Sequence, residues 1–257
     1  MSFEFRKNRG LESVDFCANE DIYYWQLWHH NWDDHEIEIF LARLPLLNKT
    51  VLEVGCGDGR VAFALAPHCR KILGVDRAGE LIDIARNRLQ KTGLLNIGFE
   101  VMDAQCLQIA SDSLDVVLYP WVLHMVEERD LAMQEAYRVL RPGGYLAVLG
   151  IHSDGDYDRI IAPFVADAGG IDPIEFYEGP IARQFDGPME VLANESFPYI
   201  FENVELARDA FAYSLKFYYR VVLNDWQKHE LGRILEDYEC EGRVRINFYA
   251  SLYIAQK

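Results

Sequence analysis

Two hydrophobic patterns alternate along residues 49–150 of this chain. Five short apolar runs predict buried strands: KTVLEV (49–54), KILGVD (71–76), NIGFEVMD (96–103), SLDVVLYP (113–120) and GYLAVLG (144–150). Three intervening segments repeat apolar residues with a helical period and predict helices: residues 59–68, 78–93 and 129–140. Because strands and helices alternate and the strands are apolar throughout, we expect a doubly wound α/β fold, with a parallel sheet between two layers of helices.

Outside this region the pattern changes. Residues 1–45 are mostly helical and rich in aromatic side chains, whereas glycine and proline gather in residues 152–190 around one short helix. Residues 204–223 and 225–237 have a helical period, and RINFYASLYIAQ (245–256) predicts a final strand. We therefore expect a helical N-terminal extension and an insertion after the fifth strand.

The segment VLEVGCGDGR (51–60) places three glycines at alternate positions between the first predicted strand and the first helix. Such a turn lies at the carboxyl edge of the sheet, where open α/β folds bind ligands, and its bare N–H groups suit an anionic group. Asp76 ends the second strand, where these folds hold ribose hydroxyls with a carboxylate. We predict a nucleoside-binding loop; the alternative is a tight turn with a packing role only.

The residue at position 60 helps to distinguish a dinucleotide cofactor from other nucleosides. The dinucleotide fingerprint GxGxxG needs a glycine there, but this chain has Arg60 and instead has GxGxG preceded by Glu53. With these features the chain resembles the class I S-adenosylmethionine-dependent methyltransferases, in particular the small-molecule, type 11 branch that includes quinone-pathway enzymes. The segments that carry the resemblance are VLEVGCGDGR, GVD, MDAQCL, SLDVVLYPWVLHMV and LRPGGYLAVLG.

The resemblance implies a Rossmann-like, seven-stranded sheet with an antiparallel last strand, and S-adenosylmethionine as cofactor, with S-adenosylhomocysteine as product. It implies that the backbone of Gly55, Cys56 and Gly57 passes the methionine part of the cofactor. Glu53 would help to place the amino group, and Tyr119 would lie near the sulfonium.

The same resemblance assigns the nucleoside end. Asp76 would hold the ribose hydroxyls, Arg77 would lie beside the adenine, and Asp103 and Ala104 would meet the adenine edge. The implied activity is methyl transfer to an oxygen, nitrogen or carbon atom of a small, partly apolar metabolite. Two alternatives stay open: an NADP-dependent oxidoreductase, in which Arg77 reads a 2′-phosphate, and a non-catalytic protein that binds S-adenosylmethionine as a regulatory or partner subunit.

Two histidines are candidate catalytic residues. His124 follows the fourth strand and His152 follows the fifth, so both belong to the edge where an acceptor would bind. Either could act as a general base if the acceptor must lose a proton early, or be a packed, hydrogen-bonded residue without a catalytic role.

The aromatic N-terminal segment has two interpretations. Trp25, Trp28 and Trp32 have the spacing of a helix stripe that faces the core. Tyr23 or Tyr24 would then be the lid residue, and we assign Tyr24 to the cofactor site, where a ring favours a sulfonium. The nearby histidines and aspartates could suggest a metal site. Adjacent residues of a helix point apart, so a solvated polar face is the better interpretation, and we predict no metal. These histidines and aspartates are His29, His30, His35, Asp33 and Asp34.

Charge and cysteine content limit the class of partner. The chain has 25 basic and 41 acidic residues, a net charge of −16, which disfavours a nucleic-acid substrate. Its five cysteines are odd in number and lack CxxC spacing, so zinc and a disulfide framework are disfavoured. No apolar signal segment or membrane span is evident, and we predict a cytoplasmic location.

The expected organisation is one methyltransferase domain over residues 1–257. Residues 1–45 would form a helical preface or lid, and residues 46–151 the cofactor-binding core. Residues 152–243 would form the insertion and the helices that cap the substrate, and residues 244–257 the final strand. The acceptor, the atom methylated and the oligomeric state do not follow from these patterns.

Overall fold

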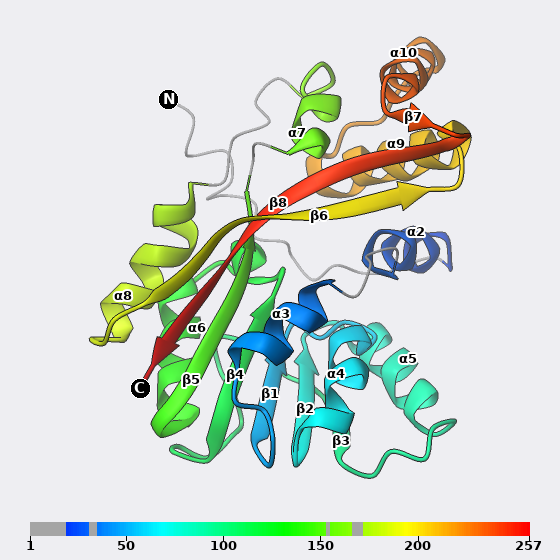
Figure 1. The fold of residues 1–257 in the computed structure, drawn as a ribbon. Coiled ribbons are helices and arrows are strands. Elements are labelled where there is room, and N and C mark those ends of the chain that lie inside the picture. The colour runs from blue at the N-terminus through cyan, green and yellow to red at the C-terminus, as the bar shows by residue number, and fades with distance from the viewer. Residues whose placement is uncertain (1–18, 31–34, 153–154, 166–171) are drawn as a thin grey trace.

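The computed structural model describes residues 19–30, 35–152, 155–165 and 172–257, and its centre is one mixed sheet (Figure 1). The strand order is β3-β2-β1-β4-β5-β8-β6, with β7 paired to β8. The strands are β1 Thr50–Val54, β2 Lys71–Asp76, β3 Ile97–Val101, β4 Leu114–Pro120, β5 Leu140–Ile151, β6 Glu190–Phe201, β7 Glu239–Cys240 and β8 Arg243–Gln256. Strands β1 to β5 pair in parallel and β8 is antiparallel to β5 and β6, which confirms a mostly parallel sheet with an antiparallel last strand; the sheet has eight strands where seven were expected.

Helices cover both faces of the sheet. They are α2 Asn19–His30, α3 His35–Arg43, α4 Arg60–Leu65, α5 Gly79–Leu89, α6 Arg129–Val139, α7 Asp156–Ile161, α8 Gly179–Gln184, α9 Val204–Tyr219 and α10 Asp225–Glu236, with short turns η1 Ala66–His68, η2 Leu123–Met125 and η3 Ile174–Glu178. Alternate residues of β1 separate the two layers: Val51 packs in a core with α3, α4 and α5, whereas Leu52 packs in a second core with α6 and α8. The fold is therefore doubly wound, as predicted. None of the described helices is long and apolar enough to cross a bilayer.

Strand β6 was not among the predicted elements. Its sequence, EVLANESFPYIF, lacks a regular alternation of apolar and polar residues and contains Pro198, which has no N–H for a ladder hydrogen bond. The strand forms at the end of the sheet, where it pairs along most of its length with β8. Pairing with a distant strand thus overrides a weak local signal.

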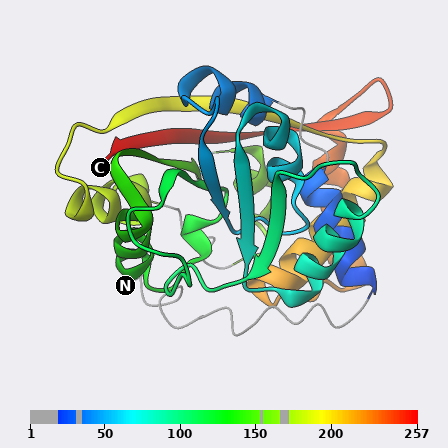
Figure 2. The same ribbon diagram turned by 90° about the horizontal axis from the view of Figure 1, so that it is seen from below.

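Strands β6 and β8 continue past the end of β5 and support an upper layer of helices (Figures 1 and 2). Helices α7 and α9 contact this ribbon, α2 and α10 pack on α9, and all four surround it in Figure 1. Trp28 of α2 lies at the centre, 7% exposed, and its indole N–H donates to the Ala210 carbonyl at 3.1 Å. The rings around it belong to Tyr157, Tyr199, Phe201, Phe211 and Phe248.

Candidate functional site

The glycine turn after β1 has a backbone that only glycine adopts without strain. Gly55, Gly57 and Gly59 have φ values of +71°, +55° and +89°, in the left-handed region that side chains disfavour. The N–H groups of Gly55 and Cys56 both donate to the Val75 carbonyl, at 2.8 and 3.0 Å. The glycines therefore let the chain turn sharply and lock onto the end of β2.

Each of these glycines also admits a neighbouring side chain. A Cβ atom would lie 2.4 Å from Val122 at Gly55, 2.5 Å from the Trp25 ring at Gly57, and 2.5 Å from the Phe99 ring at Gly59. The loop after β4, helix α2 and strand β3 thus converge on the turn. Gly57 is covered by Trp25 and is not part of the cavity lining, which differs from the prediction that its backbone directly faces the cofactor.

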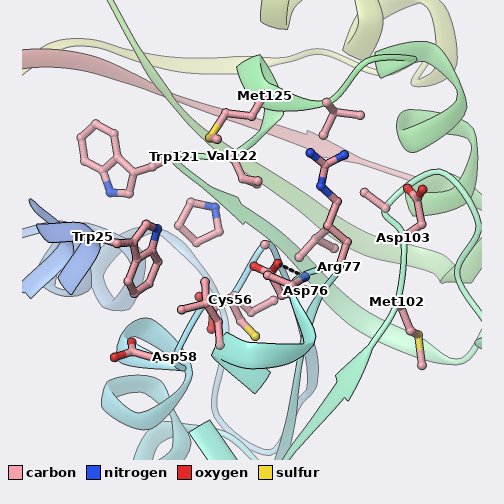
Figure 3. A pocket seen from close by; sticks show the side chains of 18 of the residues that line it. Trp25, Cys56, Asp58, Asp76, Arg77, Met102, Asp103, Trp121, Val122 and Met125 are labelled. Carbon is pink, nitrogen blue, oxygen red and sulfur yellow. Dashed lines mark hydrogen bonds between the residues drawn. The ribbon is translucent and has the colours of Figure 1, made fainter. Parts of the chain in front are cut away.

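A cavity of about 450 Å³ lies at the carboxyl edge of β1, β2 and β4, with α2 and α9 contributing Trp25, Phe217 and Tyr218 (Figure 3). Figure 3 shows Trp25 and Trp121 on one side of it and Arg77 and Asp103 on the other. The predicted cofactor residues that line it are Glu53, Gly55, Cys56, Asp76, Arg77, Asp103 and Ala104. The fold thus brings together groups that are 51 residues apart in the chain, from Glu53 to Ala104.

Besides Gly57, two more predicted cofactor residues, Tyr24 and Tyr119, lie outside this lining. Tyr24 stacks on Tyr213 with ring centroids 4.9 Å apart, because adjacent residues of a helix point about 100° apart and Trp25 faces the cavity. Tyr119 is fully buried and its hydroxyl donates to the Ala132 carbonyl at 3.2 Å. Its side chain points toward α6, so its assignment to the sulfonium has no support in this geometry.

The two candidate catalytic histidines are also outside the lining. His124 lies in η2, and the backbone N–H of His152 extends the β5–β8 pairing by donating to the Tyr249 carbonyl at 2.8 Å. Within the described ranges, no histidine lines the cavity. The geometry therefore gives neither histidine a path to an acceptor in this cavity.

The residues weighed as a metal site lie partly outside the described part of the chain. The side chains of His29 and His30, and all of Trp32, Asp33 and Asp34, lie outside the described residues. His35 has Glu38 and Glu195 nearby, at 3.8 and 3.4 Å. No cluster of three or more metal-ligating side chains occurs in the part of the chain that the structure describes.

Asp76 is tied to the glycine turn. One carboxylate oxygen accepts the Gly57 N–H and the other the Ala78 N–H, each at 2.9 Å. Burial raises the pKa of this carboxyl, and the two backbone hydrogen bonds oppose that shift. The backbone N–H of Arg77 also bonds to this carboxyl, whose four lone-pair sites still leave Asp76 able to accept from a ligand in the cavity.

Glu53 lines the cavity and has one carboxyl oxygen without a hydrogen-bond donor among the described residues. It is 2% exposed and accepts the backbone N–H of Ala62, while its Oε2 atom has no hydrogen-bond partner among the described residues. Burial raises the pKa of Glu53 well above its ordinary value, and the nearby Arg60 opposes this most strongly. A buried, unpaired carboxylate oxygen at a cavity is a fit for a cationic group such as an ammonium.

Several cavity residues were not predicted. Trp25 was assigned to a core stripe, and Trp121, Phe217 and Tyr218 were not assigned to the site. Trp121 has a φ of +58°, which is rare for a bulky residue and is found at functional sites. The position of Trp121 directly after β4 was the available sequence signal, because parallel strands end at the ligand-binding edge.

Comparison with known proteins gives matches centred on this region. The family described as "Methyltransferase domain" matches residues 52–148. The ubiquinone/menaquinone biosynthesis C-methyltransferase UbiE of Hydrogenovibrio crunogenus is 27% identical over 185 residues, 70% of this chain and 67% of that protein. The ubiquinone biosynthesis O-methyltransferase of Coxiella burnetii is 32% identical over 104 residues, 40% of this chain and 44% of that protein.

A solved structure extends the likeness to most of the chain. Phosphoethanolamine N-methyltransferase 2 of Haemonchus contortus, in complex with phosphomonomethylethanolamine and S-adenosylhomocysteine, superposes with a TM-score of 0.63. The match covers 95% of this chain and 59% of that one at 16% identity, so it shows a shared fold. The chain thus spans between about two fifths and two thirds of the length of these three relatives.

Proposed function

We propose that this chain, which belongs to the class I S-adenosylmethionine-dependent methyltransferases, transfers the cofactor's methyl group to an oxygen, nitrogen or carbon atom of a small, partly apolar metabolite. One observation carries the proposal: a single cavity gathers the glycine turn, the unpaired Glu53 oxygen and Asp76 at the carboxyl edge of the sheet. These groups match an ammonium and a pair of ribose hydroxyls, at the place where such folds bind nucleosides.

The residues divide between the two ends of the cofactor. S-adenosylmethionine supplies a methyl group already activated on a sulfonium. Glu53 binds its ammonium group, Asp76 accepts from its ribose hydroxyls, and Asp103 and Ala104 lie at the adenine edge with Arg77 beside them. Figure 3 supports this division, since Trp25 and the Asp103 region lie on opposite sides of Asp76.

The acceptor side is aromatic and apolar. Trp25, Trp121 and Met125 line the cavity away from Asp103 (Figure 3), Phe217 adds a further ring to the lining, and such a lining suits a flat or apolar molecule. Within the segments expected to cover the substrate, 1–45 and 152–243, the cavity lining comes from α2 and α9, and no described residue of 152–190 contributes to it.

Positioning can provide much of the catalysis in such a site. Burial raises the pKa of Tyr218 to about 12, so its hydroxyl keeps its proton at neutral pH and is available as a hydrogen-bond donor to an acceptor molecule. Because the sulfonium is already a good leaving group, holding the acceptor in line with the methyl group lowers the barrier without a general base.

The turnover assay tests this function directly. Purified protein with a panel of small metabolites should convert S-adenosylmethionine to S-adenosylhomocysteine, and its activity should depend only weakly on salt. A parallel calorimetric titration should show no comparable binding of NAD or NADP. Tight NADP binding without S-adenosylmethionine binding would establish the oxidoreductase alternative. Binding of S-adenosylmethionine without turnover of any acceptor would favour a non-catalytic protein. Methylation of nucleic acid that falls steeply with added salt would contradict the proposed substrate class.

Two wider assignments rest on composition alone. The net charge of −16 supports a partner other than nucleic acid. Cys56, Cys69, Cys106 and Cys240 are free thiols, and this supports a reducing compartment such as the cytoplasm.

Asp76→Asn should weaken S-adenosylhomocysteine binding by about 1.5–3 kcal/mol, the usual contribution of hydrogen bonds to a charged group. The amide also places an N–H₂ against one of the two backbone N–H donors, so we expect some loss of melting temperature. Calorimetric titration measures the affinity, and Asp83→Asn is the matched control because that exposed carboxylate on α5 lies outside the cavity. Unchanged affinity in Asp76→Asn would assign the ribose hydroxyls to another residue.

A further inference from the structure

A buried carboxylate lies behind the cavity without lining it. Glu36 of α3 is 1% exposed, and its two oxygens accept from two cavity residues: Oε1 from the Arg60 guanidinium and Oε2 from the Trp121 indole N–H. The three residues come from α3, the start of α4 and the segment after β4. Glu36 therefore connects the N-terminal part of the chain to two residues that line the cavity.

Without a ligand, the charges in this cluster balance only when Glu53 is protonated, as its burial favours. Glu36 and Glu53 are two buried carboxyls, and Arg60 is the cation that acts most strongly on Glu53. The guanidinium of Arg60 pairs with Glu36, and the Glu53 Oε2 atom has no hydrogen-bond partner among the described residues. With both carboxyls ionised, the cluster has one negative charge left, on a group that lines the cavity, and a single cation would neutralise it.

The orientation of Glu36 is constrained at both ends. One oxygen is occupied by Arg60 and the other by Trp121, whose ring also packs edge-on against Phe197 at 4.8 Å. A carboxylate held by two donors cannot rotate away from either without giving up one of these hydrogen bonds. Arg60 is thus anchored on its Glu36 side.

We propose that Glu36 is a positioning residue: it holds Arg60 away from Glu53 and so reserves the Glu53 carboxylate for the ammonium group at the methionine end of the cofactor. This inference rests on the proposed function and adds a residue of the N-terminal segment to it. Without Glu36, the guanidinium of Arg60 becomes the partner of Glu53 and competes with the ammonium group of the ligand.

The affinities of two ligands distinguish a positioning role of Glu36 from a purely structural role. S-adenosylhomocysteine carries the ammonium group, whereas 5′-methylthioadenosine has the same adenosine and thioether but lacks the amino-acid portion. Glu36→Gln should weaken S-adenosylhomocysteine by about tenfold or more, as expected when a charge-assisted hydrogen bond is lost, and leave methylthioadenosine unchanged. Asp76→Asn, in contrast, should weaken both ligands.

A second substitution should reverse the first. In Glu36→Gln/Arg60→Met the competing cation is absent, so S-adenosylhomocysteine should again bind with nearly wild-type affinity. Arg60→Met alone should bind it at least as tightly as the wild type, which keeps the test informative if Glu36→Gln does not fold. Asp130→Asn, which breaks the exposed Arg183–Asp130 pair, is the control for loss of one carboxylate and should change neither ligand's affinity.

The outcomes are distinct. An equal loss for both ligands in Glu36→Gln, an unchanged affinity for S-adenosylhomocysteine, or a loss that persists in the double variant would overturn the positioning role of Glu36. Weaker binding in Arg60→Met alone would also overturn it. If the wild type binds neither ligand, the proposed cofactor is wrong and the inference fails with it.

Discussion

Gly57→Val is expected to abolish measurable S-adenosylhomocysteine binding and to destabilise the protein. The residue has a φ of +55°, and its new Cβ would lie 2.5 Å from the Trp25 ring. The left-handed conformation costs a side chain about 1–2 kcal/mol, and overpacking adds about 1–3 kcal/mol. We expect the turn to change conformation to relieve this strain. The hydrogen bond from the Gly57 N–H to Asp76 and the contact of the turn with the Trp25 ring are then lost. Calorimetric titration and chemical denaturation measure the two effects.

A control substitution separates the effect of backbone strain from the effect of changing the ligand site. Gly242 has a φ of +79° in the β7–β8 turn, and no atom lies within 4 Å of its Cβ position. Gly242→Val should therefore show only the conformational cost and retain ligand affinity. Equal affinity in the two variants would mean that the conformation of the turn at Gly57 does not matter for binding.

Trp28→Ala should lower the free energy of unfolding by about 3–5 kcal/mol, as for other large aromatic residues removed from a core. The ring lies among aromatic side chains of α7, β6, β8 and α9, and its N–H bond to Ala210 ties α2 to α9. Its loss removes the anchor that holds Trp25 over the glycine turn and Gln26 against Asp58, at 3.1 Å. Urea denaturation gives the stability, and turnover should fall at temperatures where the fold persists.

Trp226→Ala is the matched comparison. That indole belongs to α10 and is 69% exposed, so its removal should change the stability by no more than about 0.5 kcal/mol. A comparable loss in both variants would show that the upper aromatic core contributes little, and that α2 is held by other contacts.

Much of the fold follows from local sequence. The strands and helices of residues 49–150 have strong periodic patterns bounded by glycine or proline, and the structure has them within a few residues of the predicted limits. The glycine turn is equally local, since its three glycines stand at the three alternate positions that have positive φ values. Asp76 lies at the end of β2 and beside that turn because β2 pairs with β1.

Which of two neighbouring residues on a helix or strand faces the cavity depends on how that element packs against the rest of the protein. The pattern of α2 identified an aromatic helix, but Trp25 rather than Tyr24 faces the cavity, because Trp28 rotates the helix into the core beneath α9. Tyr119 was correctly placed on β4, yet the pleat directs its side chain to α6 and away from the carboxyl edge.

Local patterns thus predict the main strands and helices of residues 49–150, the glycine turn and the edge of the sheet at which the cavity lies. Contacts between distant segments account for the pairing of β6 with β8, for the contributions of α2 and α9 to the cavity lining, and for the hydrogen bonds of Glu36 with Arg60 and Trp121. The two groups of features differ in the sequence separation of the interactions that produce them. A periodic pattern reflects interactions over a few residues, whereas Glu36 and Trp121 are 85 positions apart and meet only because the sheet brings their elements to the same edge.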